Sequence, residues 1–172
     1  GTQSSEIYRG PAPFSEPEST ALRDFLSGEP RLRAHLDIHT FGQLLLSPWG
    51  YTLDLPQDGD LFRTIDLAMR SDIHAATGRY YDAGPGITTI YQTSGSAPDW
   101  VYGEQGVPSW TIELRDQGRT GFVLPADQII PTSLENAAAI ETIAAWMLMP
   151  VSVTVANAPP AVVAADQQVE IT

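Results

Sequence analysis

The chain has 172 residues, of which 42% are hydrophobic, and this is enough for one globular domain with its own core. Nine Lys and Arg residues against 21 Asp and Glu residues give a formal charge of -12, which argues against binding to nucleic acids or anionic membranes. We find no run of 18 apolar residues that predicts a membrane span, and the polar beginning, GTQSSEIYRG, does not resemble a secretory leader. The chain contains no cysteine, so only His, Asp or Glu side chains are available to bind a metal.

The first third of the chain predicts one helix and two strands. Ser15 and Glu18 have the spacing of a capping box at a helix start, and Gly28 suits the helix end. Residues 31–39 alternate between polar and apolar side chains, as in a strand. The apolar run at residues 44–46 predicts a buried neighbouring strand.

The middle of the chain predicts two further helices around another strand. An amphipathic helix is expected over about residues 60–76, closed by Gly78. Residues 84–86, Gly-Pro-Gly, break the chain, and residues 87–91 are rich in β-branched side chains, which favours a strand. Ser96 is expected to cap a short helix.

The last elements complete an α/β pattern. The stretch 107–122 contains a strand, and a second capping box at residues 132–135 predicts a helix that runs to about Met149. Strands that alternate with helices predict part of a three-layer mixed sheet flanked by helices. We expect residues 1–150 to belong to one domain and residues 151–172 to be a linker or the start of an appended β module.

Glu113 is the first candidate for a functional residue. It lies inside the apolar run Trp-Thr-Ile-Glu-Leu of a predicted strand, where an ionised carboxylate is unfavourable unless it is paired, bound to a metal or given a raised pKa. From this stretch alone, a salt bridge to Arg115 or Arg119 explains the residue as well as an active carboxylate does.

The three histidines do not form a local metal site. His35 and His39 are four residues apart, which on a strand corresponds to about 13 Å and is too far for one ion. His74 is expected in the last turn of its helix, as a surface residue that suits the helix dipole. His39, Tyr91 and Glu113 are all expected on strands or strand ends, and this combination suits metal-assisted hydrolysis.

Residues 8 to about 150 resemble the C-terminal half of the catalytic domain of zinc metallocarboxypeptidases of the carboxypeptidase A/B type. Four segments and the terminal helix carry the resemblance: YRGPAPFSEPES, LDIHTFGQLLLSPWGY, ITTIYQTSGSAPDW and YGEQGVPSWTIELRDQGRTGFVLPADQIIPT. The resemblance implies half of a zinc carboxypeptidase-like fold. It also implies that the complete enzyme hydrolyses the C-terminal residue of peptides or proteins with the help of zinc.

The resemblance also assigns roles to individual residues. His39 matches the family's last zinc ligand, and Glu113 matches the general base that activates the attacking water. Tyr91 matches the mobile tyrosine that closes over the substrate. Thr40 matches a residue whose backbone carbonyl contacts substrate, and Phe122 matches an aromatic residue near the cleft.

A specificity pocket is implied as well. Its lining residues match Leu46, Gly50, Thr93, Pro98 and Thr111. Members of the family that prefer basic residues carry an acidic residue where this chain has Pro98. The resemblance therefore implies an apolar pocket that prefers apolar or aromatic C-terminal residues.

One departure from the family is large. The other two zinc ligands come from a His-x-x-Glu motif in the N-terminal half, and none of the three histidines here is followed by Glu three residues later. We therefore expect zinc to take one ligand from this chain and the others from the missing half, and we expect the chain to be inactive alone. The alternatives are a non-catalytic carboxypeptidase-like binding domain and a half-domain completed by another chain.

Two further expectations follow. Half of a sheet leaves an unpaired strand edge, so the chain alone is expected to associate with itself. Secretion or an extracellular location is expected from the resemblance, without a visible signal peptide.

Overall fold

The computed structural model describes residues 2–6 and 8–149 of the chain. The strands are β1 (His35–Thr40), β2 (Leu44–Ser47), β3 (Asp82–Pro85) and β4 (Ser109–Leu114). The helices are α1 (Pro17–Ser27), α2 (Gly59–Thr77), α3 (Gly86–Thr89), α4 (Ala97–Gln105) and α5 (Ile129–Leu148), with a 3-10 turn at Ala126–Gln128. Residues 151–172, expected to be a linker or the start of a β module, lie outside the described residues.

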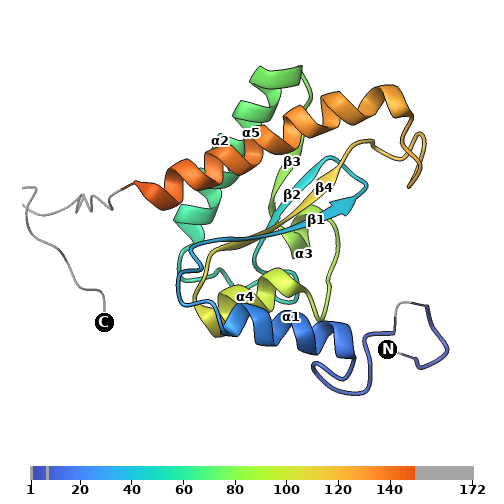
Figure 1. Cartoon of the computed structure of the whole chain (residues 1–172), viewed down its shortest axis with the longest axis vertical. Helices are drawn as coiled ribbons and strands as arrows, with labels where there is room; N and C mark the ends of the chain where they lie inside the picture. Colours follow the sequence, from blue (N-terminus) through green and yellow to red (C-terminus); the bar gives the residue numbers. More distant parts are fainter. Residues whose placement is uncertain (1, 7, 150–172) are drawn as a thin grey trace, which may run out of the picture.

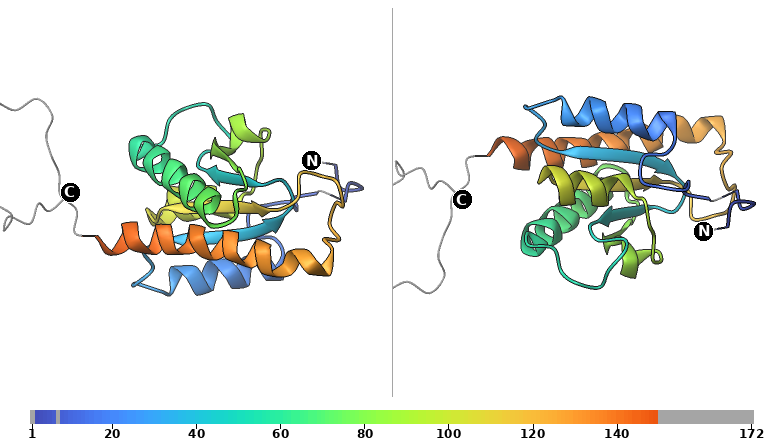
Figure 2. Two further views of the ribbon diagram at one scale, coloured as in Figure 1. Left: turned by 90° about the horizontal axis from the view of Figure 1, so that it is seen from above. Right: turned by 90° about the horizontal axis from the view of Figure 1, so that it is seen from below.

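The four strands form one mixed sheet in the order β1-β4-β2-β3. Strand β4 pairs in parallel with β1 and antiparallel with β2, while β2 and β3 are parallel. Helices α2 and α5 lie side by side on one face of this sheet, and α1 and α4 lie on the other side (Figures 1 and 2). The three-layer mixed sheet flanked by helices is thus confirmed.

The core lies between the sheet and the pair α2 and α5. Alternate residues of β4, Trp110 and Ile112, point into it together with Leu45 of β2, and all three are almost completely buried. Ile65 of α2 and Ile143 of α5 pack against them. Because side chains alternate along a strand, the residues between these core positions lie on the opposite face of the sheet.

The predicted strand at residues 87–91 is wrong. The strand of this region comes earlier, at β3, and the chain then turns into the short helix α3, where the N–H of Ile90 donates to the carbonyl of Gly86. Pairing of β3 with β2 decides which residues are extended, and this long-range contact overrides the β propensity of the Ile-Thr-Thr-Ile run.

Both predicted capping boxes are also wrong. Helix α1 begins at Pro17, and the hydroxyl of Ser15 bonds to the side chain of Glu16 rather than to a helical N–H. Helix α5 begins at Ile129, so Thr132 lies inside it and donates to the carbonyl four residues back. Glu135 is therefore an interior residue of α5, where it is 1% exposed.

Helix α2 agrees closely with its prediction. It ends at Gly78, which adopts the left-handed conformation that suits glycine, with φ of 73°. His74 lies in the last turn as expected, but it is partly buried and its ring stacks on Tyr80 at 4.0 Å. Among the described residues, no helix is both long enough and apolar enough to span a membrane.

Candidate active site

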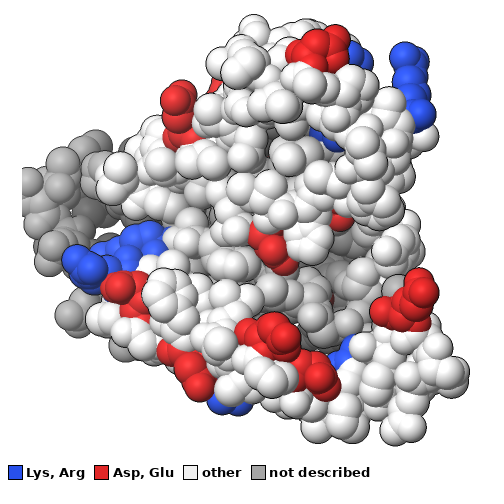
Figure 3. All heavy atoms as spheres, turned by 45° about the vertical axis from the view of Figure 1, so that its right-hand side comes forward, with Lys and Arg blue, Asp and Glu red and all other residues white. Residues whose placement is uncertain are grey.

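The register of the sheet brings the predicted zinc ligand and the predicted base together. His39 of β1 lies directly opposite Glu113 of β4, and Asp37 lies opposite Thr111 one step earlier. All four residues lie on the face of the sheet away from α2 and α5. In Figure 3 the molecule is turned so that the side towards which β1 points in Figure 1 comes forward. Acidic side chains are scattered over this side, between large areas without charged residues.

The carboxylate of Glu113 is partly buried and has one oxygen atom without a hydrogen-bond partner among the described residues. Its Oε2 atom is buried and makes no hydrogen bond within the described part of the chain. Burial raises the pKa of Glu113, His39 lowers it and Asp37 raises it, with a net increase. The alternative that Glu113 is salt-bridged to Arg115 is wrong, because Arg115 pairs with Glu135 instead. No ion pair with Arg119 is present among the described residues either.

His39 is half-exposed and has a carboxylate beside it. Its Nε2 atom lies 3.0 Å from Oδ2 of Asp37. A carboxylate in this position orients an imidazole and makes it a better metal ligand, so His39 fits the role of a zinc ligand. Within residues 2–6 and 8–149, however, no group of three or more potential ligands is close enough together to hold an ion.

A buried polar network fixes the strand end just beyond Glu113. Arg115 forms an ion pair with Glu135 of α5, and the pair is almost completely buried. Glu135 also accepts hydrogen bonds from Tyr81 at 2.9 Å and from Thr77 at 2.8 Å. Burial alone would raise the pKa of Glu135, but these hydrogen bonds and the guanidinium lower it overall. The network connects Arg115, the residue after β4, to α2, to α5 and to Tyr81, the residue before β3, and so holds the strand that carries Glu113.

The turn after β4 carries the predicted aromatic residue. Oxygens of Asp116 accept backbone N–H groups from Gly118, Arg119 and Thr120, which close the turn. Phe122 lies beyond it, 80% exposed, and packs edge-to-face on Phe41, next to Thr40 at the end of β1. Through Phe41, Phe122 lies near the end of β1 that carries His39 and Thr40.

The residues predicted to line the specificity pocket come from β2, β4, α4 and the loops that follow β2 and precede α4. Leu46 of β2 lies opposite Thr111 of β4, next to Glu113 along the strand. Gly50 is in contact with Thr93, whose N–H donates to the Gly50 carbonyl at 2.8 Å, and a side chain at position 50 would collide with Thr93. Pro98 is buried in the first turn of α4.

Tyr91 follows the short helix α3 instead of ending a strand. Its side chain is 64% exposed, and the loop behind it is connected to the body by a hydrogen bond from Gln92 to the carbonyl of Tyr51. The position thus leaves the phenol free of the packed core, as a side chain that closes over a substrate requires.

Asp37 and the pairing of Arg115 with Glu135 were both missed from the sequence. Asp37 could have been found, because the alternation of β1 places it on the same face as His39. The Arg115–Glu135 pair could not, because the two residues are 20 positions apart and the sequence pattern predicts Glu135 as part of a helix cap.

Comparisons with known proteins show which family the chain resembles. The sequence profile described as zinc carboxypeptidase matches residues 1–139. Carboxypeptidase B of Astacus astacus is 41% identical over 142 residues, which cover 81% of this chain and 47% of that protein. Carboxypeptidase A1 of Sus scrofa is 43% identical over 142 residues, covering 81% of this chain and 33% of that protein.

Solved structures give the same result. The structure of bovine thrombin-activatable fibrinolysis inhibitor in complex with tick carboxypeptidase inhibitor superposes with a TM-score of 0.79 at 31% identity, covering 83% of this chain and 49% of that one. Carboxypeptidase A from Helicoverpa armigera superposes with a TM-score of 0.71 at 28% identity, covering 81% and 36%. The chain spans less than half the length of each of these relatives. It belongs to the zinc carboxypeptidase family.

Proposed function

We propose that this chain supplies the C-terminal half of the catalytic domain of a zinc-dependent carboxypeptidase, which removes the C-terminal residue of peptides or proteins. One observation carries the proposal: His39 and Glu113 lie opposite each other on adjacent parallel strands, and Glu113 presents a buried carboxylate oxygen without a hydrogen-bond partner among the described residues. Such an orphaned oxygen is unfavourable in a purely structural role, and it is the acceptor that a general base needs.

In this mechanism Glu113 moves the proton. Its Oε2 atom takes a proton from the attacking water and delivers it to the nitrogen of the leaving amine. The raised pKa of Glu113 makes its carboxylate a stronger base than an ordinary one. His39, oriented by Asp37, is one of the residues that would hold zinc. When bound, the zinc would lower the pKa of the water and polarise the scissile carbonyl.

We expect the substrate's last side chain to contact Leu46, Gly50, Thr93, Pro98 and Thr111. Asp99, which follows Pro98 in α4, accepts the N–H of Gly50 with both oxygens, at 3.0 and 3.1 Å. Asp99 is thereby turned towards the backbone, which supports a preference for apolar or aromatic residues over basic ones. Tyr91 closes over the bound residue, and Thr40 and Phe122 contact the chain that precedes it.

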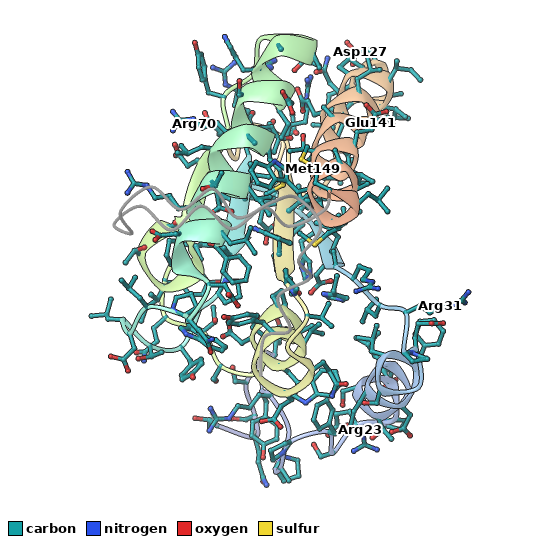
Figure 4. The ribbon with its side chains drawn as sticks, turned by 90° about the vertical axis from the view of Figure 1, so that its left-hand side faces the viewer. Arg23, Arg31, Arg70, Asp127, Glu141 and Met149 are labelled. Atoms are coloured by element: carbon teal, nitrogen blue, oxygen red, sulfur yellow. The ribbon has the colours of Figure 1, made fainter. Side chains whose placement is uncertain are left out.

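The remaining zinc ligands come from outside this chain, and two features mark where that part would dock. One edge of β1 has no strand partner among the described residues. Beside it, Leu32 and Leu36 form an apolar groove with Ile140, Met147 and Leu148 of α5, with a volume of about 580 Å³. Figure 4 shows the end of α5 at Met149, and Arg31 points away from the body of the molecule. This surface suits the N-terminal half of the domain, or another chain that completes it.

The same surface supports self-association of the 172-residue chain in isolation. We also propose that the complete protein is secreted, in keeping with its acidic character. Peptide and protein C-termini are the partners, and nucleic acids and membranes are not.

The test compares the 172-residue chain with the complete protein on peptides with free C-termini. The chain alone is expected to release no amino acid, and the complete protein is expected to release apolar residues. Glu113→Gln should lower kcat by about 10²–10⁴-fold while the zinc content stays unchanged. The matched control is Glu104→Gln, an exposed glutamate of α4 that should leave kcat unchanged. Hydrolysis by the 172-residue chain alone, abolished by Glu113→Gln, would contradict the proposal.

A further inference from the structure

A second cavity lies on the opposite face of the sheet from Glu113. Its volume is about 580 Å³, and it lies beside the first half of α2 at the sheet edge formed by β3. Small-molecule sites typically have about 300–1,000 Å³, so the cavity has the size of a ligand site. None of the residues assigned to peptide hydrolysis lines it.

The floor of this cavity includes a buried carboxylate. Asp66 of α2 lines the cavity and is only 3% exposed. Its Oδ2 accepts the hydroxyl of Ser47 at 2.9 Å, and its Oδ1 accepts the indole N–H of Trp110 at 2.8 Å. Both partners are neutral, and Asp66 makes no ion pair within the described part of the chain. The negative charge of Asp66 is therefore buried without a cation.

A buried charge of this kind is unusual. Aspartate is almost never fully buried unless it is paired, since hydrogen bonds from neutral groups replace only part of its hydration. Burial accordingly raises the pKa of Asp66 to about 6, even though Ser47 and Trp110 act in the opposite direction. A cation that entered the cavity would supply the missing countercharge.

The walls of the cavity determine what kind of cation fits. Most of the lining is apolar, from Pro48, Leu55, Pro56, Phe62, Leu67 and Pro85. Leu55 is 82% exposed and Leu67 is 52% exposed, so a ligand would also cover apolar surface that now faces solvent. A small hydrated metal ion would leave these walls uncovered, whereas an organic cation with an apolar body matches both features.

We propose that this cavity is a binding site for a small organic ammonium ion, with the ammonium group on the carboxylate of Asp66 and its apolar body against the surrounding leucine and proline side chains. The site is separate from the proposed peptidase site and does not depend on zinc. Two other charged residues line the cavity, Asp60 and Arg63, and both are exposed. Arg63 forms no ion pair within the described residues, so it leaves Asp66 available.

The test uses two probes of nearly equal shape, phenethylammonium and the uncharged 2-phenylethanol. Binding of each to the 172-residue chain at pH 7.5 is measured by isothermal titration calorimetry. Phenethylammonium should bind at least about 10-fold more tightly than the alcohol, which corresponds to about 1.4 kcal/mol. Equal affinities for the two probes, or no detectable binding of phenethylammonium, would overturn the proposal.

Variants locate the site. Asp66→Asn keeps the shape of the side chain and should abolish the preference for the ammonium, while binding of 2-phenylethanol reports that the cavity is intact. Asp60→Asn removes an exposed carboxylate from the rim and should leave the preference unchanged. A preference that survives Asp66→Asn, or that is lost with Asp60→Asn instead, would overturn the assignment to Asp66.

The unsubstituted chain gives an independent measurement. Ser47 and Trp110 face Asp66 and are uncharged, and the other charged residues that line the cavity are Asp60 and Arg63 at its exposed rim. Affinity for phenethylammonium should therefore fall as the pH is lowered from 8 to 5, because Asp66 becomes protonated, while affinity for 2-phenylethanol stays constant. An ammonium affinity that is independent of pH would contradict the proposal.

Discussion

Oδ2 of Asp37 lies 3.0 Å from Nε2 of His39, two residues further along the same strand. The two side chains share a face of β1 because side chains alternate along a strand. Glu113 lies on the neighbouring strand, and the charge of Asp37 contributes to its raised pKa. One carboxylate thus acts on both the proposed metal ligand and the proposed base.

Replacing Asp37 should therefore weaken zinc binding. In the complete protein, Asp37→Asn is expected to lower zinc affinity by about 10–100-fold, because residues that orient a metal-binding histidine typically contribute this much. Competition with a chromogenic chelator measures the affinity. The substitution should also lower the pKa of Glu113, so activity per bound zinc should persist to lower pH than in the parent protein.

The control is Asp24→Asn, which removes an exposed carboxylate that pairs with Arg23 on α1. It should change neither zinc affinity nor the acidic limb of the pH profile. Unchanged zinc affinity in Asp37→Asn would show that His39 does not depend on its neighbour.

Glu135→Gln should destabilise the fold strongly. It removes the charge that neutralises buried Arg115, and breaking a buried ion pair typically costs about 3–5 kcal/mol of unfolding free energy. Urea denaturation measures the loss, and Glu141→Gln, an exposed glutamate on the same helix, is the control (Figure 4). Because the pKa of Glu135 is lowered, its contribution is present above the ordinary glutamate pKa and is lost as the pH falls through the lowered value. Equal unfolding free energies of Glu135→Gln and Glu141→Gln would contradict a stabilising role of the Arg115–Glu135 ion pair.

Asp66 should have the opposite pH dependence. Its folded-state pKa is raised to about 6, so stability is highest below the unfolded pKa of 3.8 and declines as the pH rises through 6. A shift of this size corresponds to an order of about 3 kcal/mol of unfolding free energy between pH 4 and pH 7. Urea denaturation at both pH values measures the unfolding free energies of Asp66→Asn and of the parent chain. Relative to the parent chain, the variant should be more stable at pH 7 than at pH 4. A difference that does not change with pH would contradict the raised pKa.

Self-association should depend on the groove beside β1. Leu148 is 81% exposed and Ile140 is 40% exposed, and both line this groove. We expect the 172-residue chain to form dimers or larger species in sedimentation equilibrium, and Ile140→Glu combined with Leu148→Glu to shift it towards monomer. Leu55→Glu changes an equally exposed leucine at the opposite edge of the sheet and should not. A monomeric parent chain would contradict self-association through this groove. An equal effect of Leu55→Glu and of the double substitution would contradict it as well.

The sequence predicted those elements whose signals are local. Helix α2 was predicted almost to the residue because its apolar stripe ends just before Gly78. Strand β2 was predicted because residues 44–46 form a short apolar run. The start of α5 and the extended residues around β3 were wrong, since packing and strand pairing decide them and neither is visible within a few residues.

The candidate site divides in the same way. His39, Tyr91 and Glu113 could be named from a family resemblance, and their roles remain predictions. The ion pairs around these residues depend on the folded sheet. Arg115 pairs with Glu135 of α5 and not with Glu113, which lies only two positions away in the sequence. The cavity at Asp66 could not be predicted from the sequence, because its lining combines residues of α2, β2 and β3.

The parallel pairing of β1 with β4 has a consequence for the order of folding. Residues 35 and 109, which begin the two strands, are 74 positions apart, and the chain between them forms α2, β2, β3 and α4. Closing so long a loop is slow and entropically unfavourable until the intervening elements have packed. We therefore expect His39 and Glu113 to come together late in folding, after most of the helices and strands between them have formed. Until then, neither the proposed metal ligand nor the proposed base has the other beside it.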